Sequence, residues 1–373
     1  MSRNILITGA AGYIGGSIVA DLLSKHPEIT KDQIVSAVRT DEQAKALSTL
    51  GINVLKLDLS DEQAVINEIS SHKISVIVHA ANSISPGLAL PLINALAKQK
   101  EVAGKPTYFI HTSGLSAFYV NSGWSCSVNK GTDAVFETEK ELAESYPVRK
   151  TDVMVIEHAQ AQGVTPFVVV PSIVCEKSRA LSLDLLTGEQ DGRGTGAWNQ
   201  LSVMIPGLTR ASLKLGKVYK FDENISLQAV HISDPTALYC RIIHAALNTE
   251  EIPSGKEGYY FAVAHAMDMW EFPGHHAAAV EARGLVTSDK PEVYPSDEFA
   301  AKAIDLPVEF LEILYESGGH FTATRPQSIG WKPEWDRERV LKNGDAEIED
   351  VLELGKAKSS LIDSLFAAVG RAR

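Results

Sequence analysis

The first 23 residues hold the feature that most constrains the fold, an apolar run followed directly by a glycine turn and a helical pattern. Residues 5–7 are predicted to form a buried strand, and Gly9, Gly12 and Gly15 follow with the spacing G-x-x-G-x-x-G. Glycine at these points allows a tight turn, a close approach of phosphate and packing of helix on strand. Such a strand, turn and helix present backbone N–H groups to a pyrophosphate. The predicted cofactor contacts here are Gly9, Ala11, Gly12, Tyr13 and Ile14.

Composition excludes several classes of partner. The chain has 35 lysines and arginines against 47 aspartates and glutamates, a net charge of −12, and no cluster of basic residues. We therefore expect neither nucleic acid nor an anionic membrane surface as a partner. No apolar stretch reaches the roughly 18 residues of a membrane span, and because the first strand starts almost at once we expect no signal or transit peptide. Cys126, Cys175 and Cys240 lack paired spacing, which is typical of reduced thiols in a cytoplasmic protein.

Strand-like and helix-like segments alternate along the chain. Strands are predicted at 33–39, 52–58, 74–81, 107–111 and 165–171, with helices at 41–50, 62–71, 91–100 and 147–162. Strands that are apolar on both faces and alternate with helices are typical of a parallel sheet covered by helices on both sides. The predicted class is therefore α/β, a Rossmann doubly wound parallel sheet with a smaller C-terminal α/β substrate lobe. Ligands of such sheets bind beyond the carboxyl ends of the strands.

The end of the second predicted strand indicates which dinucleotide binds. A carboxylate there would bind the ribose 2′-hydroxyl, whereas an arginine accommodates a 2′-phosphate. Arg39 stands at this end, with Asp41 two residues further on and Lys45 in the next helix. We therefore predict NADP(H) rather than NAD(H), although Arg39 could also be a solvated strand-end side chain. Asp58 and Leu59 are predicted to contact the adenine, with the N-cap of the next helix as another role for Asp58.

Tyr146 and Lys150 stand four residues apart at the head of the helix predicted after the fifth strand. Residues at this spacing share a helix face, and Pro147 is tolerated at the first helical position. An ordinary tyrosine pKa near 10 makes the phenol a poor acid–base at pH 7, and a lysine one turn away would lower that pKa. The pair therefore predicts Tyr146 as the general acid and Lys150 as the group that tunes it and holds the nicotinamide ribose. A nearby serine would orient the carbonyl that Tyr146 protonates.

These segments together resemble the extended short-chain dehydrogenases/reductases, in the branch of dihydroflavonol-reductase-like and epimerase-like proteins. The resemblance covers nearly the whole chain. It rests on residues 8–15, Asp58-Leu59, His79-Ala80-Ala81, Thr112-Ser113, Tyr146 to Lys150, and residues 171–174, 230–234 and 329–333. An insert at 192–196, with the sequence GRGTG, is similar to that of fungal-type members.

The resemblance implies further site residues. Cofactor contacts are expected from Ala80, Ala81, Pro171 and Ile173, the last two beside the nicotinamide. Many relatives have two serines after the threonine, whereas here Ser113 is followed by Gly114. We predict Ser113 as the catalytic serine that orients the substrate, with Ser116 in the next loop as the alternative.

The predicted domain organisation follows the same pattern. Residues 1–175 with about 207–250 would form the NADP-binding domain, about 176–206 and 251–335 the substrate lobe, and 336–373 a C-terminal helical segment. The predicted substrate-binding residues are Ser116, Trp124, Trp198 and Asn199, and ordinary core packing is the alternative for each tryptophan. His265, His275 and His276 have no accompanying motif such as H-E-x-x-H. We interpret them as surface or loop histidines and predict no metal site.

The predicted function is NADPH-dependent reduction of an aldehyde or ketone on a small or mid-sized hydrophobic molecule, with Tyr146 as proton donor. One alternative is an NAD-dependent nucleotide-sugar epimerase or dehydratase, against which Arg39 and the lack of a clear cationic set for a sugar nucleotide argue. Another is a non-catalytic dinucleotide sensor, which would not need the pair of Tyr146 and Lys150. The expected partner is a small carbonyl substrate, and the chain is expected to be a monomer or a homodimer.

Overall fold

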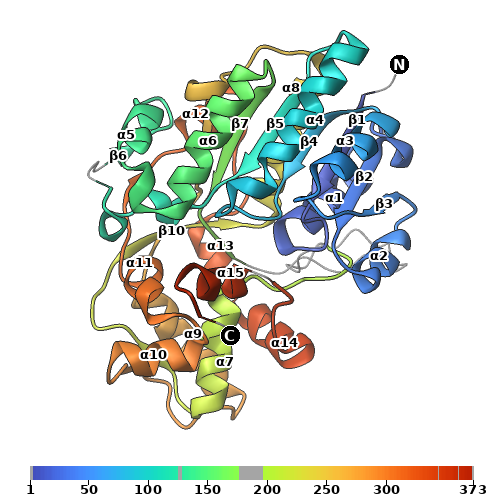
Figure 1. The fold of residues 1–373 in the computed structure, drawn as a ribbon. Helices are drawn as coiled ribbons and strands as arrows, with labels where there is room; N and C mark the ends of the chain where they lie inside the picture. The colour runs from blue at the N-terminus through green and yellow to red at the C-terminus, as the bar shows by residue number, and fades with distance from the viewer. Residues whose placement is uncertain (1–2, 125–127, 176–195, 343, 360, 372–373) are drawn as a thin grey trace.

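The computed structural model describes residues 3–124, 128–175, 196–342, 344–359 and 361–371. Its centre is a seven-stranded sheet with the strand order β11-β7-β5-β4-β1-β2-β3 (Figure 1). All neighbouring strands in this sheet run parallel. The strands are β1 (Asn4–Thr8), β2 (Ile34–Val38), β3 (Asn53–Lys56), β4 (Ile74–His79), β5 (Tyr108–Thr112), β7 (Thr165–Pro171) and β11 (Tyr259–Ala262). The predicted doubly wound parallel sheet is confirmed.

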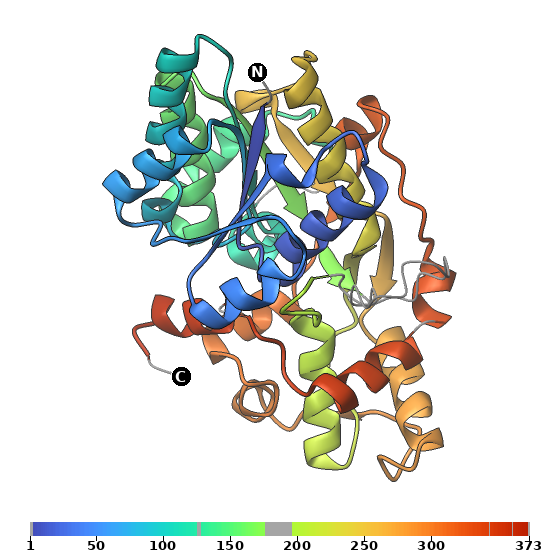
Figure 2. The ribbon, with the colours of Figure 1, turned by 90° about the vertical axis from the view of Figure 1, so that its right-hand side faces the viewer.

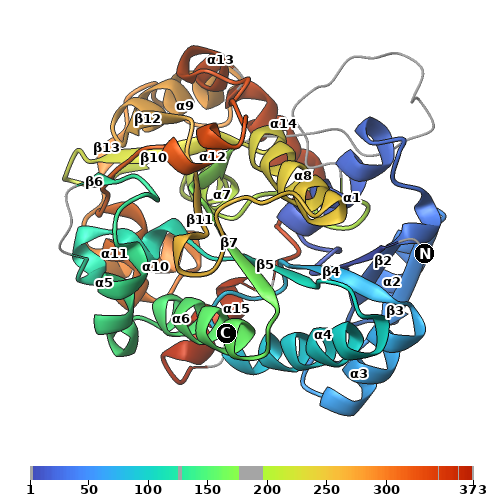
Figure 3. The ribbon, with the colours of Figure 1, turned by 90° about the horizontal axis from the view of Figure 1, so that it is seen from above.

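Helices cover both faces of this sheet (Figure 3). One face carries α3 (Glu62–Ser71), α4 (Leu90–Ala103) and α6 (Pro147–Ala161), and the other carries α1 (Tyr13–Lys25) and α8 (Ser233–Asn248). Two short helices, α2 (Asp41–Ser48) and α5 (Val135–Glu141), lie nearer the edges. Each face has its own apolar core, built from buried residues of the strands and of the helices packed on them. Burial on both faces is why the strands are continuously apolar.

Local sequence signals determine where these helices begin and end. The Thr40 hydroxyl accepts a hydrogen bond from the Gln43 amide at the start of α2, and Asp61 does the same for Ala64 at the start of α3. Short polar side chains at this position satisfy amides that have no partner within the helix. Gly104 ends α4 with a positive φ of 63°, a conformation that glycine adopts without strain.

A smaller lobe lies beyond the carboxyl ends of the strands (Figure 1). Its helices are α7 (Met204–Leu215), α9 (Glu271–Ala282), α10 (Asp297–Ile304), α11 (Leu311–Tyr315), α13 (Arg337–Lys342), α14 (Gly344–Leu354) and α15 (Leu361–Ala368). A three-stranded sheet joins it to the larger domain, formed by β8 (Ile173–Cys175), β10 (Ser226–His231) and β12 (His265–Asp268). Short strand pairs are β9 (Tyr219–Lys220) with β13 (Glu292–Val293), and β6 (Val128–Asn129) with β14 (His320–Phe321). The last short helix is α12 (Thr324–Ser328).

Two segments lie in the part of the molecule opposite to the one predicted. Strand β11 falls within 251–335, which was assigned to the lobe, yet it pairs with β7 at the edge of the main sheet. Helix α7 falls largely within 207–250, which was assigned to the dinucleotide domain, yet it packs on α10 and α14 of the lobe. Chain order therefore does not follow domain order here. Residues 176–195 of the predicted lobe, with most of the 192–196 insert, lie outside the described residues.

The C-terminal chain passes between the sheet domain and the lobe (Figure 2). Lys356 forms an ion pair with Asp305 of the lobe at 2.9 Å. Two residues later, the Lys358 amide donates to Asn199 Oδ1 at 2.9 Å. The segment that contains Lys356 and Lys358 is thus attached both to the lobe and to residues beside the glycine turn. Within the described residues, no helix is long and apolar enough to cross a membrane.

Candidate dinucleotide and carbonyl site

A cavity of about 890 Å³ opens between the carboxyl ends of the main strands, the lobe and the C-terminal chain. Most of the predicted site residues line it: Gly9, Ala11, Gly12, Tyr13, Ile14, Arg39, Asp58, Leu59, Ala80, Ala81, Ser113, Ser116, Tyr146, Pro171 and Ile173. Four predicted residues are not among its lining, namely Lys150, Trp124, Trp198 and Asn199. The tertiary fold therefore joins the glycine turn and Tyr146 in one cavity.

The glycine turn has the geometry that a pyrophosphate requires. Gly9 has a φ of +71°, and a Cβ added there would lie 2.5 Å from the Ala80 carbonyl oxygen at the end of β4. A Cβ on Gly15 would lie 2.4 Å from the Gly9 oxygen. Helix α1 begins after Gly12 with no side-chain cap and no acidic residue in its first turn. The positive end of the helix dipole therefore faces the turn without a competing carboxylate in that first helical turn, and the residues fit a dinucleotide.

Charged side chains line the far end of the cavity, beyond β2. Arg39 and Lys56 both line it. Asp41, the carboxylate closest in sequence to the end of β2, is not part of the lining and pairs with Lys56 at 2.8 Å. Asp58 lines the same end, where its Oδ1 accepts from the Ser60 amide at 2.9 Å. Because Asp61 caps α3, the alternative N-cap role of Asp58 is wrong.

At the other end, two hydroxyl groups meet. Tyr146 immediately precedes α6, and its hydroxyl donates to Ser116 Oγ at 3.1 Å. Ser116 lies in the short 3₁₀ helix that follows β5. Burial raises the pKa of Tyr146 above its usual value, and the contact with Ser116 and the Arg149 charge oppose that rise only in part. The pair can donate protons and hydrogen bonds to a ligand in the cavity.

Ser113, the predicted catalytic serine, makes a different contact. Its hydroxyl donates a short hydrogen bond to Asp152, a fully buried carboxylate on α6. Asp152 also lies 3.1 Å from Nε2 of His111 on β5. The pKa of neighbouring Glu139 is raised well above its usual value, mainly by burial and in addition by the charge of Asp152. Ser113 thus belongs to a buried polar cluster between β5 and α6, and Ser116, the alternative, is the serine that contacts Tyr146.

The position of Lys150 corrects the prediction made from its spacing. Its ammonium pairs with Glu144 at 2.8 Å, and the side chain is 46% exposed. Tyr146 has φ −151° and ψ 128°, so it lies before the helix rather than within it. The rule that residues i and i+4 share a face holds only inside a helix. Lys150 therefore does not lie beside the phenol, and the expected lowering of the tyrosine pKa is replaced by a rise.

The cation beside Tyr146 is Arg149, which the sequence reading did not single out. Its guanidinium carbon lies 5.5 Å from the centre of the Tyr146 ring. The side chain is fully buried and donates to the Ala117 carbonyl at 2.6 Å and to the Ser122 carbonyl at 2.8 Å. A guanidinium has five N–H donors in a rigid planar group, so it can bind several backbone carbonyls at once. Arg149 thus holds the loop that carries Ser116 against the start of α6.

The three other residues absent from the lining have packing roles. Trp124 is 2% exposed and packs edge-on against Phe118, which is the core-packing alternative. The backbone amide of Asn199 donates a hydrogen bond to the Ala11 carbonyl of the glycine turn at 3.2 Å. The Lys358 ammonium lies over the Trp198 ring, 4.3 Å from the ring centre. Trp198 and Asn199 therefore contact the C-terminal chain and the glycine turn, and the substrate contacts expected of all three residues stay predictions.

The lobe side of the cavity was largely missed. It is lined by apolar side chains of the lobe and of α15, together with three cations: Met204, Phe310, Leu314, Tyr315, Leu361, Ile362, Leu365, Arg210, Lys356 and Lys358. The signal for α15 was present, since Leu361, Ile362 and Leu365 have helical spacing. Which apolar face meets the cavity was decided by the path of the C-terminal chain.

Comparison with known proteins agrees with this architecture. Residues 5–103 match the model of the NAD dependent epimerase/dehydratase family. A curated protein described as "Oxidase ucsJ", from Acremonium sp, is 25% identical over 318 residues, which cover 81% of this chain and 86% of the relative.

Solved structures share the fold at low identity. UDP-glucose 4-epimerase from Thermotoga maritima has a TM-score of 0.60 at 14% identity, covering 94% of this chain and 100% of that one. Vestitone reductase from alfalfa has a TM-score of 0.55 at 17% identity, covering 94% and 99%. The Bordetella bronchiseptica enzyme WbmG, solved with NAD and UDP, has a TM-score of 0.56 at 16% identity, covering 94% and 95%. The expected resemblance to extended short-chain dehydrogenases/reductases is confirmed, and the chain shares the fold of these solved structures.

Proposed function

We propose that this protein binds NADP(H) and reduces an aldehyde or ketone on a small or mid-sized hydrophobic molecule. The observation that supports this most is the Tyr146–Ser116 hydroxyl pair, which lines the same cavity as the glycine turn. When bound, the nicotinamide would supply the hydride. Tyr146 would give its proton to the carbonyl oxygen, and Ser116 would hold that oxygen by a hydrogen bond.

The raised pKa of Tyr146 keeps the phenol in the form that a proton donor needs, while making it a weaker acid. A buried phenol with a pKa above its usual value stays protonated at neutral pH. It can therefore donate a proton to the oxygen of a reduced carbonyl, but it is poorly suited to take one from an alcohol. The mostly apolar lobe side of the cavity suits a hydrophobic substrate.

The charges beyond β2 support NADP(H). A 2′-phosphate would add negative charge where Arg39 and Lys56 line the cavity. Asp41, which would suit a 2′-hydroxyl, is held by Lys56 instead. NAD complexes occur among proteins of this fold, so the choice between the two cofactors depends on these residues.

The direct test is to titrate the purified chain with NADPH and with NADH, and then to follow NADPH consumption over a panel of apolar aldehydes and ketones. We expect tighter binding of NADPH and turnover of at least one carbonyl compound. Tighter binding of NADH would overturn the cofactor proposal, and binding without turnover over the whole panel would count against the reductase.

A non-catalytic dinucleotide sensor is the second candidate, and the surface position of Lys150 favours it. The usual partner of the tyrosine is absent from the cavity lining, so part of the argument for catalysis from Tyr146 and Lys150 is lost. A sensor would bind the dinucleotide without turning over a carbonyl compound, and its binding would be indifferent to loss of the Tyr146 hydroxyl.

An epimerase or dehydratase acting on a sugar nucleotide is the third candidate. Arg210, Lys356 and Lys358 line the lobe side and could meet a diphosphate. Tightly held NAD and binding of UDP in a calorimeter would support it. The cytoplasmic location and the monomeric or homodimeric state stay predictions, and size-exclusion chromatography would test the second.

A further inference from the structure

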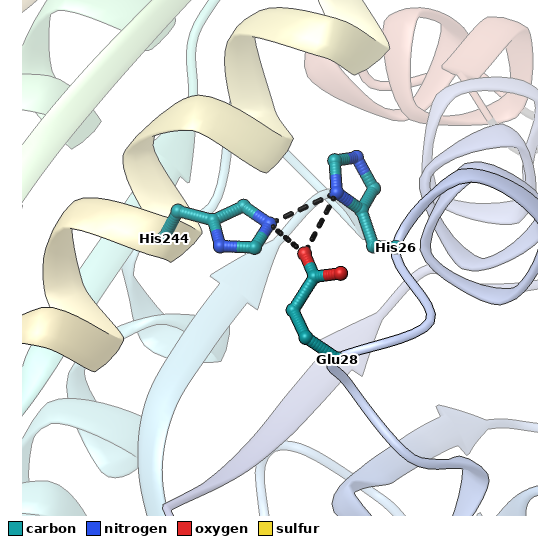
Figure 4. A group of neighbouring side chains, drawn as sticks. All are labelled: His26, Glu28 and His244. Carbon is teal, nitrogen blue, oxygen red and sulfur yellow. Dashed lines mark hydrogen bonds and ion pairs between the residues drawn. The ribbon is translucent and has the colours of Figure 1, made fainter.

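Two histidines and a glutamate meet on the side of the sheet that carries α1 and α8 (Figure 4). His26 follows the last turn of α1, Glu28 lies two residues on, and His244 comes from α8. In the described part of the chain, these are the residues whose potential ligand atoms converge within 4.8 Å. None of the three lines the cavity described above.

The distances between the three ligand atoms are close to those around a tetrahedral ion. His26 Nδ1 and Glu28 Oε1 are 3.2 Å apart, and His244 Nε2 lies 2.9 Å from His26 Nδ1 and 3.0 Å from Glu28 Oε1. Zinc–nitrogen and zinc–oxygen bonds of about 2.0–2.2 Å at tetrahedral angles separate ligand atoms by roughly 3.3–3.5 Å. An ion would therefore fit after the three atoms move apart by a few tenths of an ångström.

The chemistry of these groups also suits a cation. The cluster offers two ring nitrogens and one carboxylate oxygen. The nearby Arg241 guanidinium is held by Glu250 at 2.8 Å, so its charge is partly neutralised. Neutral imidazoles and a carboxylate are the forms that bind zinc.

We propose that His26, Glu28 and His244 bind a divalent transition-metal ion, with zinc favoured by the two nitrogen ligands and one oxygen ligand. Glu28 is 54% exposed and the histidines are 24% exposed, which leaves the fourth position open to water. The ion would join the end of α1 to α8. Because it lies outside the cofactor cavity, its effect would be on stability rather than on the reaction.

The experiment is a calorimetric titration of the EDTA-treated full-length chain with zinc chloride, with melting curves in the presence and absence of zinc. We expect one ion per chain and a melting temperature raised by zinc. His244→Gln and Glu28→Gln should each weaken zinc binding at least about tenfold, since even outer-shell changes cost about 10–100-fold. Glu28→Gln changes an exposed side chain, so it tests the proposal even if His244→Gln fails to fold.

The matched control is His72→Gln. His72 also pairs with a glutamate, Glu68, at 3.3 Å, but no third ligand group from the described residues joins them. This variant should bind zinc as the wild type does. Cobalt in place of zinc should give a visible spectrum without a thiolate charge-transfer band, which excludes cysteine ligands. No binding by the wild type, or binding unchanged in His244→Gln and Glu28→Gln, would overturn the proposal.

Discussion

The two ends of the cavity are built by different means. The glycine-turn end comes from one continuous segment and the end of β4, and its critical contacts are between backbone atoms, such as Gly9 against Ala80. The tyrosine end combines the loop after β5, the start of α6, the lobe and the C-terminal chain, and its critical contacts are between side chains. Backbone geometry follows from residue spacing, whereas a side-chain contact depends on how separate elements are rotated. This is why the residues predicted for the first end line the cavity, whereas Lys150, predicted for the second, does not.

The strongest test of the tyrosine end is Tyr146→Phe. Loss of a positioned proton donor should lower kcat by about 10²–10⁴-fold while leaving dinucleotide affinity unchanged. Because burial raises the pKa of Tyr146, the wild-type kcat/KM should not fall through loss of this proton below about pH 10. Steady-state kinetics with a carbonyl substrate over a pH range, with a fluorescence titration of NADPH, would measure both. Unchanged turnover would remove Tyr146 from the chemistry.

The strongest test of the glycine end is Gly9→Ala, with Gly104→Ala as its matched control. Both positions have positive φ, but a Cβ on Gly9 meets the Ala80 carbonyl at 2.5 Å, whereas one on Gly104 meets nothing within 4 Å. Gly104→Ala should cost about 1 kcal/mol of unfolding free energy and Gly9→Ala about 3 kcal/mol or more. Urea denaturation would measure both, and equal costs would show that crowding at Gly9 does not matter.

Arg39→Gln tests which dinucleotide is preferred at the end of the cavity beyond β2. Removal of a charge-assisted contact to a 2′-phosphate should weaken NADPH binding by about 10–100-fold and leave NADH binding nearly unchanged. The pair of Kd values, measured at one salt concentration, gives the answer. An equal loss for both cofactors would mean that Arg39 acts on the fold or on a part that the two share.

Substitutions of Ser116 and Ser113 should have different effects, the first on turnover and the second on stability. Ser116→Ala removes the partner of the Tyr146 hydroxyl, so turnover should fall about tenfold or more with little change in stability. Ser113→Ala removes the donor to buried Asp152, which should cost about 1–3 kcal/mol of unfolding free energy with turnover largely kept. Comparing kcat with the denaturation midpoint for each variant checks this. The reverse pattern would restore Ser113 as the substrate-orienting serine.

The smallest effect is expected from Lys150→Ala. Its ammonium is solvent-exposed and pairs with an exposed carboxylate. Turnover and cofactor affinity should therefore stay within about twofold of wild type. A large loss of kcat would show that Lys150 turns into the cavity when the dinucleotide binds.

The sequence by itself determined the parallel sheet, the glycine turn and most of the cavity lining at the glycine-turn end. These features are local, because strand periodicity, helix caps and glycine spacing act within a few residues of one another. Gly9, Arg39 and Asp58 could therefore be placed on one edge of the sheet from their positions at strand ends alone.

The tertiary structure alone decided the rest. It started α6 only after Tyr146, which separated the phenol from Lys150 and paired it with Ser116. It brought α15 over the cavity, and it joined His26 to His244 across 218 residues. Such contacts depend on how whole elements pack, and no spacing along the chain records that packing.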